Sequence, residues 1–186
     1  MTELLTLARD AGFEETTPLQ AAQLVFRPEV RDMCRADRCS SYGESWCCPP
    51  ACPSLEEMTR RMWDYDQGVL VETVGTMADD FDYEAMMEAE TRHKERFRQL
   101  TQALYHRYGR ENVLPMGAGT CRRCARCTYP DAPCRFPEEQ VVSMEAYGLL
   151  VSQVCQDCGA VYYHGPRTMT YVSCIFLRRG AEGGKK

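Results

Sequence analysis

Four cysteines in one short segment constrain this chain more than any other feature. Cys121, Cys124 and Cys127 recur at intervals of three, and Cys134 follows within the same proline-flanked segment. A tetrahedral zinc site needs closely spaced sulfurs, usually delivered as pairs from two separate loops, whereas a cubane cluster is larger and its thiolates stand farther apart. One loop can therefore supply three corners of a cube while a fourth cysteine arrives from farther along the chain. The spacing predicts a [4Fe-4S] cluster bound by these four residues.

The assignment of Cys134 leaves alternatives open. The segment resembles the ferredoxin pattern with a longer final gap, and in two-cluster ferredoxins the fourth cysteine binds the other cluster. A structural zinc ribbon could use the same residues, although its second cysteine pair is not obvious. A disulfide knot is a further alternative. We favour a single cube that includes Cys134.

A second group of five cysteines occurs earlier in the chain. Cys34, Cys39, Cys47, Cys48 and Cys52 lie within residues 34–52, and four prolines and glycines within residues 43–53 exclude regular structure there. Such a loop can direct several thiolates inward. We predict a second cluster at Cys34, Cys39, Cys48 and Cys52, with zinc at the same residues as the alternative. Adjacent cysteines cannot easily face one metal, and we choose Cys48 over Cys47 because Cys48 directly precedes a proline.

The remaining cysteines and the histidines carry weaker signals. Cys155 and Cys158 lie in a segment of helical character, where packing alone explains two small apolar residues. Together with Cys174 they could form an incomplete third site, which we leave out of the predicted ligands. The three histidines show no ligand spacing with any cysteine, and we expect two of them on the exposed side of a long helix, namely His93 and His106.

Charge and the N-terminal sequence bear on compartment and partners. Residues 1–10 carry acidic side chains and an arginine instead of the apolar core of a secretory signal, so we expect a reducing cytoplasm, where clustered cysteines favour metal. No run approaches the roughly 18 apolar residues of a membrane span. A net charge of −5 argues against nonspecific nucleic-acid binding. The second cysteine loop is itself basic. Its four arginines either offset a negative cluster or attract a redox partner protein or small anionic substrate: Arg122, Arg123, Arg126 and Arg135.

The pattern of apolar residues predicts alternating helices and strands. We expect helices over 2–11, from Ser54 with a Glu57 capping box, over 83–108 and at 143–146, extended chain over 22–30, and strands over 68–74, 112–116 and 171–177. This order indicates an α/β or α+β fold, in which helices flank a small sheet and two cysteine-rich metal-binding loops lie at one end. We expect one metal-binding domain over 1–179 and a disordered polar tail over 180–186.

Several motifs in a fixed order together resemble a known family. They are Arg31-Asp32-Met33-Cys34-x4-Cys39, Tyr42-Gly43-x2-Trp46-x-Cys48-Pro49-Pro50, Gly117-x-Gly119-x-Cys121-x2-Cys124-x2-Cys127, Pro133-Cys134-Arg135-x-Pro137 and Ser143-Met144-Glu145-Ala146-Tyr147-Gly148. Over residues 8–177 the chain resembles a prokaryotic family of uncharacterised, cysteine-rich, predicted metal-binding proteins. The resemblance implies small cytoplasmic proteins that are presumed to bind iron–sulfur clusters, with no reaction settled.

These observations lead to one functional hypothesis and two alternatives. The hypothesis is an iron–sulfur protein that transfers single electrons to or from a partner enzyme. The first alternative is an iron–sulfur enzyme or maturation factor, in which the first cluster lacks Cys52 as a ligand and an open iron binds substrate beside Arg31, Tyr42 or Glu44. The second is a zinc-stabilised binding module. The sequence leaves open whether the protein is an enzyme.

Overall fold

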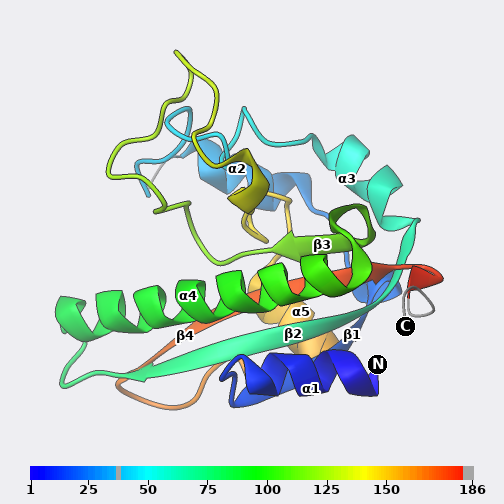
Figure 1. Cartoon of the computed structure of the whole chain (residues 1–186). Coiled ribbons are helices and arrows are strands. Elements are labelled where there is room, and N and C mark those ends of the chain that lie inside the picture. The colour runs from blue at the N-terminus through cyan, green and yellow to red at the C-terminus, as the bar shows by residue number, and fades with distance from the viewer. Residues whose placement is uncertain (37–38, 182–186) are drawn as a thin grey trace.

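The computed structural model describes residues 1–36 and 39–181, so most of the predicted polar tail lies outside the described residues. The fold is α+β, with helices around one four-stranded antiparallel sheet in the order β1-β2-β4-β3 (Figure 1). This agrees with the predicted small sheet flanked by helices. The elements are α1 (Thr2–Asp10), β1 (Glu15–Gln20), η1 (Ala21–Gln23), α2 (Pro28–Arg35), α3 (Leu55–Met62), β2 (Tyr65–Thr76), α4 (Tyr83–Tyr108), η2 (Arg110–Asn112), β3 (Val113–Met116), η3 (Pro137–Glu139), α5 (Val151–Cys158) and β4 (Thr168–Arg178).

Local signals explain where the predicted helices begin and end. At the start of α3 the Ser54 hydroxyl accepts the Glu57 amide at 3.2 Å, and the Glu57 carboxylate accepts the Ser54 amide at 2.7 Å, which completes the expected capping box. The Asp82 carboxylate caps α4 by accepting the Ala85 amide at 3.1 Å. Helix α4 ends at Gly109, whose φ of 85° favours glycine. The long helix therefore has the predicted bounds.

The two faces of the sheet carry different cores. Helices α1 and α4 cover one face, where Val69, Val71 and Ile175 of the central strands pack against Leu100 and Leu104 of α4. Residues Val172, Cys174 and Phe176 point to the opposite face, because side chains alternate along a strand. We call the first the helix face and the second the sulfur face, whose core also includes several methionines and cysteines.

Figure 1 shows where the cysteine-rich segments lie. The cyan segment after α2 and the yellow-green segment after β3 lie together at one side of the molecule, above β3 and away from α1. Both connect to the sulfur face of the sheet, since Cys47, Cys52 and Met116 belong to its core. The predicted gathering of two cysteine-rich loops at one end of a small sheet agrees with this arrangement.

Three local features differ from the sequence prediction. Residues 22–30 are extended only between η1 and α2, where Leu24 and Arg27 have extended backbone angles and Phe26 forms an isolated bridge with Leu149. Pro28, at which the extended chain was expected to break, occupies the first turn of α2, where its missing amide hydrogen costs nothing. The preceding strand β1 was not predicted. Residues 143–146 form turns instead of a helix.

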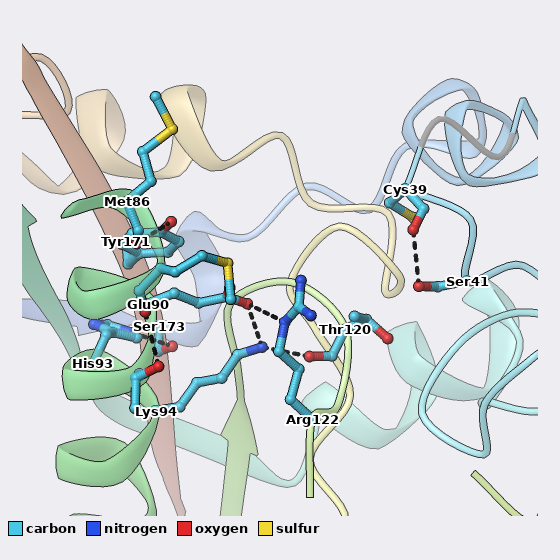
Figure 2. A network of polar contacts seen from close by, with 12 residues as sticks. Cys39, Ser41, Met86, Glu90, His93, Lys94, Thr120, Arg122, Tyr171 and Ser173 are labelled. Carbon is cyan, nitrogen blue, oxygen red and sulfur yellow. Dashed lines mark hydrogen bonds and ion pairs between the residues drawn. The ribbon is translucent and has the colours of Figure 1, made fainter. Parts of the chain in front are cut away.

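His93 also differs from its prediction. It is fully buried on the helix face, whereas His106 is exposed as expected. Its Nε2 lies 2.8 Å from Ser173 Oγ (Figure 2). Its Nδ1 lies 3.0 Å from Thr73 Oγ1, so both ring nitrogens are hydrogen-bonded. These partners come from β2 and β4, which the helical periodicity alone could not reveal.

Across residues 1–36 and 39–181, no helix combines the length and the apolar character needed to cross a membrane.

Candidate metal centre

All four predicted ligands of the second loop line one hollow at the protein surface. The hollow has a volume of about 700 Å³ and its wall includes Cys121, Cys124, Cys127 and Cys134. Cys121 is exposed and the other three are partly exposed. The loop contains neither helix nor strand between Gly117 and Phe136. The structure therefore brings together the four residues that their spacing predicted as ligands.

Helix α4 fixes the beginning of this loop. The Glu90 carboxylate accepts hydrogen bonds from Lys94 Nζ at 2.6 Å and from Arg122 Nε at 3.1 Å, and Lys94 also donates to the Thr120 carbonyl (Figure 2). Lys94 and Arg122 outweigh the effect of burial and hold the pKa of Glu90 below its usual value. A charged network on a rigid helix thus sets the position of the residue directly before Cys121.

A second set of contacts holds the end of the loop. The Arg123 guanidinium donates to Glu139 at 2.8 Å and lies over the Phe136 ring at 4.3 Å from its centroid. The Phe136 amide donates to Cys134 Sγ at 3.4 Å. Backbone N–H donation to sulfur stabilises a thiolate and raises the potential of a cluster that the thiolate binds.

The two cysteine-rich segments contact each other directly. Trp46 Nε1 donates to the Ala132 carbonyl at 3.1 Å, and the Trp46 ring meets the Tyr129 ring edge-on with centroids 4.9 Å apart. Cys48 Sγ lies 3.4 Å from Thr120 Oγ1. These contacts place the first group beside the hollow of the second.

Two thiols in the second loop are acidic. A hydrogen bond with the Cys47 thiol is the main cause that lowers the pKa of Cys121 to about 6, and the same contact raises the pKa of Cys47. Burial opposes the ionisation of Cys127, but hydrogen bonds from the backbone of Tyr129 and Trp46 lower its pKa overall. The thiolate is the form that binds metal, so the environment favours binding.

The predicted residues of the first group interact with one another. Cys34, in the last turn of α2, interacts electrostatically with Cys39, Cys48 and Cys52. Burial raises the pKa of Cys34, Cys48 and Cys52. Buried neutral thiols that lie together become thiolates when a cation offsets their charge. Cys48 interacts with Cys39 and also with Thr120 and Cys121 of the second loop, whereas Cys47 is hydrogen-bonded to Cys121, so the choice between Cys47 and Cys48 stays a prediction.

Arg31 holds the first group in place. Its guanidinium donates to the carbonyls of Pro53, Ala146 and Cys52 and lies 3.5 Å from Cys52 Sγ. The same guanidinium opposes the burial effect on the pKa of Cys52. Arg31 therefore positions Cys52, which differs from the substrate-binding role considered for it in the open-iron alternative.

A buried carboxylate adjoins the first group. Glu145 interacts electrostatically with Cys34, and its Oε2 is buried without a hydrogen-bond partner. Burial raises the pKa of Glu145. A buried carboxylate oxygen without a donor is costly, and a nearby metal or a donor on a ligand would satisfy it. Together with the thiols, this orphaned atom gives the first group a donor set that fits a metal centre.

The cysteine side chains of each group lie near one another, but in the described chain they are not arranged around a common metal position. Among the described residues, no three His, Cys, Asp or Glu side chains converge on a common position that could hold a metal ion. The conclusion that these residues suit a metal centre therefore rests on the hollow and on the chemistry of its thiols. Sequence reasoning missed the contribution of Cys47 and of the Glu90–Lys94 pair, although an i,i+4 acid–base pair on a helix is a readable signal.

Comparison with known proteins is consistent with this chemistry. Residues 17–177 match the family described as predicted metal-binding protein (DUF2284), and the chain belongs to this family. No curated protein matches the chain. No solved structure matches it either.

Proposed function

We propose that this metal-binding protein is an iron–sulfur protein that transfers single electrons to or from a partner enzyme. In this proposal Cys121, Cys124, Cys127 and Cys134 hold one [4Fe-4S] cluster. Cys34, Cys39, Cys48 and Cys52 hold a second. The observation that carries the proposal is the surface hollow that all four cysteines of the second loop line.

The residues around the hollow would perform three tasks. The thiolates bind the iron, and a bound cluster supplies a site that accepts and returns one electron. The Phe136 amide stabilises charge on Cys134. The Glu90–Lys94–Arg122 network keeps the loop in place while the charge changes. A rigid site is useful for electron transfer because it limits reorganisation.

The surface position supports exchange with a protein partner. Arg126 and Arg135 are exposed on the rim of the hollow, whereas Arg122 and Arg123 pair with Glu90 and Glu139. The exposed pair gives the rim a positive charge that would attract an acidic surface. This favours docking of an acidic redox partner directly over the cysteines.

A pair of neighbouring substitutions tests the cluster assignment. Cys124→Ser replaces a predicted ligand with a residue of similar size, and Ala125→Ser makes a matched change at the exposed position beside it. Both variants are purified without oxygen, and iron, acid-labile sulfide, zinc and the visible spectrum are measured per chain. We expect near eight iron and eight sulfide in the unchanged protein and in Ala125→Ser, and about four of each in Cys124→Ser.

The alternative outcomes separate the candidates. Full iron in Cys124→Ser would contradict the assignment of the second loop. Stoichiometric zinc in a colourless protein would replace the electron carrier with a zinc-stabilised binding module. Only four iron in the unchanged protein would remove the second cluster and leave the first group for another role.

One further observation supports an enzyme or maturation factor instead. A cavity of about 340 Å³ adjoins the hollow and shares Cys121, Arg122 and Arg123 with it. The hydroxyl of Thr101, on α4 in the wall of this cavity, is buried without a hydrogen-bond partner. A cavity of this volume with Cys121 in its wall can hold a small ligand next to the second loop.

The spectrum of the reduced protein distinguishes the two roles. An electron carrier with four thiolates per cluster keeps the same EPR spectrum when cyanide or sulfide is added at millimolar concentration. A site with an open iron gives a changed spectrum with either anion, since a vacant iron position accepts an external ligand. A changed spectrum would therefore favour the enzyme, and an unchanged one the carrier.

A further inference from the structure

A third group of cysteines lies apart from the two loops, on the sulfur face of the sheet. Cys155 and Cys158 lie on α5, Cys174 lies on β4, and Glu72 lies on β2. In the antiparallel register Leu70 pairs with Cys174 and Glu72 pairs with Val172, so Glu72 and Cys174 are diagonal neighbours on one face. The connection from α5 to β4 adds His164. One helix, two strands and the connection between α5 and β4 therefore bring sulfur, carboxylate and imidazole groups together.

Hydrogen bonds and charge interactions link these side chains. The Cys155 thiol donates to Glu72 Oε1 at 3.8 Å, and His164 Nε2 lies 3.4 Å from Glu72 Oε2. Cys174 interacts electrostatically with both Cys155 and Cys158. Cys155 and Cys174 are fully buried, whereas Cys158 and His164 are partly exposed. The partly exposed pair offers an ion a path from the solvent to the buried thiols.

Glu72 is a buried carboxylate on the sulfur face that lies among metal-ligating side chains. Its side chain is 2% exposed, and the groups that act on it include the Cys155 thiol, the His164 imidazole and the like-charged Glu15. A buried carboxylate is costly unless it is paired or helps to bind a metal. Three thiols and one imidazole around it form the donor set of a tetrahedral zinc site.

We propose that Cys155, Cys158, Cys174 and His164 bind one zinc-class divalent ion, and that Glu72 orients His164. His164 binds through Nδ1 and donates from Nε2–H to the Glu72 carboxylate, an arrangement in which a carboxylate fixes a ligating imidazole. The thiols release their protons to solvent when the ion binds. Because the three thiols do not yet converge on one position, Cys158 and His164 turn inward on binding.

This site is independent of the proposed iron–sulfur clusters and would have a different purpose. With all four positions filled by protein ligands, a zinc ion has no open site for a substrate and does not change its charge. It would tie α5 and the following connection to the central strand β4. The ion would thus stabilise the sulfur face behind the first cysteine group.

Metal analysis of variants tests the proposal in the full chain. The protein is produced with added zinc and purified without oxygen, and zinc, iron and sulfide are measured per chain. Cys158→Ser and His164→Ala change the two partly exposed ligands, so the fold is expected to survive, which circular dichroism checks. His106→Ala is the matched control, because His106 is exposed on α4 away from the site.

The expected result is one zinc per chain in the unchanged protein and in His106→Ala. Cys158→Ser and His164→Ala lose that zinc while iron and sulfide stay the same. Zinc X-ray absorption shows three sulfurs at about 2.3 Å and one nitrogen at about 2.0 Å, and the nitrogen is lost in His164→Ala. Glu72→Gln keeps the ligands but weakens zinc binding by about 10- to 100-fold in competition with a chelator.

Two results would overturn the proposal. One is an unchanged protein without zinc after production in its presence. The other is zinc that stays in Cys158→Ser and His164→Ala but leaves in Cys124→Ser, which would place the zinc in the second loop. Loss of iron and sulfide alone in Cys124→Ser would bear on the iron–sulfur proposal and leave this one intact.

Discussion

The two faces of the sheet use the same strands to build different cores. On the helix face, the buried core in the described residues consists of aliphatic and aromatic side chains with one alanine, without cysteine or methionine. On the sulfur face, much of the chain that covers the sheet is irregular. The core there includes four cysteines and four methionines: Cys47, Cys52, Cys155, Cys174, Met58, Met62, Met116 and Met144. Successive residues of β4, such as Cys174 and Ile175, point to opposite cores.

This contrast indicates that the two faces of the sheet have different roles. The helix face buries branched side chains against two regular helices, and burial of this kind contributes most of the stability of a small domain. The sulfur face depends on loops, on polarisable side chains and on buried polar groups such as Glu72 and Glu145. Such a face can arrange ligands in many directions, and a bound metal would satisfy a group such as the Glu145 carboxylate oxygen that has no hydrogen-bond partner.

Removal of the metal should separate the two faces most strongly. Chelation under reducing conditions takes away the cation that offsets the clustered thiolates, so the loops are expected to open. We expect hydrogen exchange at amides of residues 43–52 and 117–136 to accelerate tenfold or more, while amides shared between β2 and β4 keep their protection. Mass spectrometry of the metal-loaded and metal-free protein measures both. Equal acceleration of hydrogen exchange on both faces would contradict the assignment of different roles to them.

A cavity in the helix face should have the converse effect. Leu100 is fully buried, and Leu100→Ala is expected to lower the free energy of unfolding by about 2–5 kcal/mol. Metal bound per folded chain should not change. Urea unfolding and metal analysis measure the two quantities, with exposed Gln99→Ala as the control on the same helix. Loss of metal from the folded Leu100→Ala variant would show that the faces are coupled.

His93 gives the helix face a pH dependence of its own. Burial is the main cause that lowers its pKa to about 3, against about 6.5 in the unfolded chain. The unfolded state therefore binds a proton below pH 6.5 that the folded state rejects, so stability falls as the pH falls through this range. Between pH 7.0 and 5.5 we expect a loss of about 1 kcal/mol from this residue.

The variant His93→Gln isolates this contribution. Glutamine can still bond to Thr73 and Ser173 but does not titrate in this range. Urea unfolding at the two pH values should therefore show a smaller loss in the variant than in the unchanged protein. The same loss in both proteins would mean that other groups cause the pH dependence.

The difference between the faces also explains what the sequence could predict. Periodicity and end signals predicted α4 on the helix face, and a local capping box predicted the start of α3, although Met58 and Met62 of α3 pack in the sulfur-face core. Strand β1 contains Pro18 and has one buried residue, Leu19, which gives no clear alternation. The burial of His93 depends on hydroxyls from two distant strands, and no pattern within one helix records such partners.

The candidate site shows a similar limit. Spacing alone selected the four cysteines of the second loop that line the hollow, because their arrangement is local in the chain, but it did not select Cys47, which also lines the hollow. The contact of Cys47 with Cys121 joins segments about seventy residues apart, and neither segment has periodic structure. The grouping of Glu72 with Cys155 and His164 likewise depends on how α5 docks on the sheet. Tertiary contacts of this kind are not encoded in local spacing.

The smallest expected effect concerns the contact between the two cysteine-rich segments. Trp46→Phe removes the hydrogen bond to Ala132 and keeps an aromatic ring near Tyr129, so it should cost about 0.5–1 kcal/mol. If the segments enclose the metal only while they are docked, iron should leave the variant about two- to fivefold faster when a chelator is added without oxygen. Trp63→Phe is the control, because Trp63 is 72% exposed at the end of α3. Equal release rates in both variants would show that each segment holds its metal without the other, and the sulfur face would then consist of two separate sites.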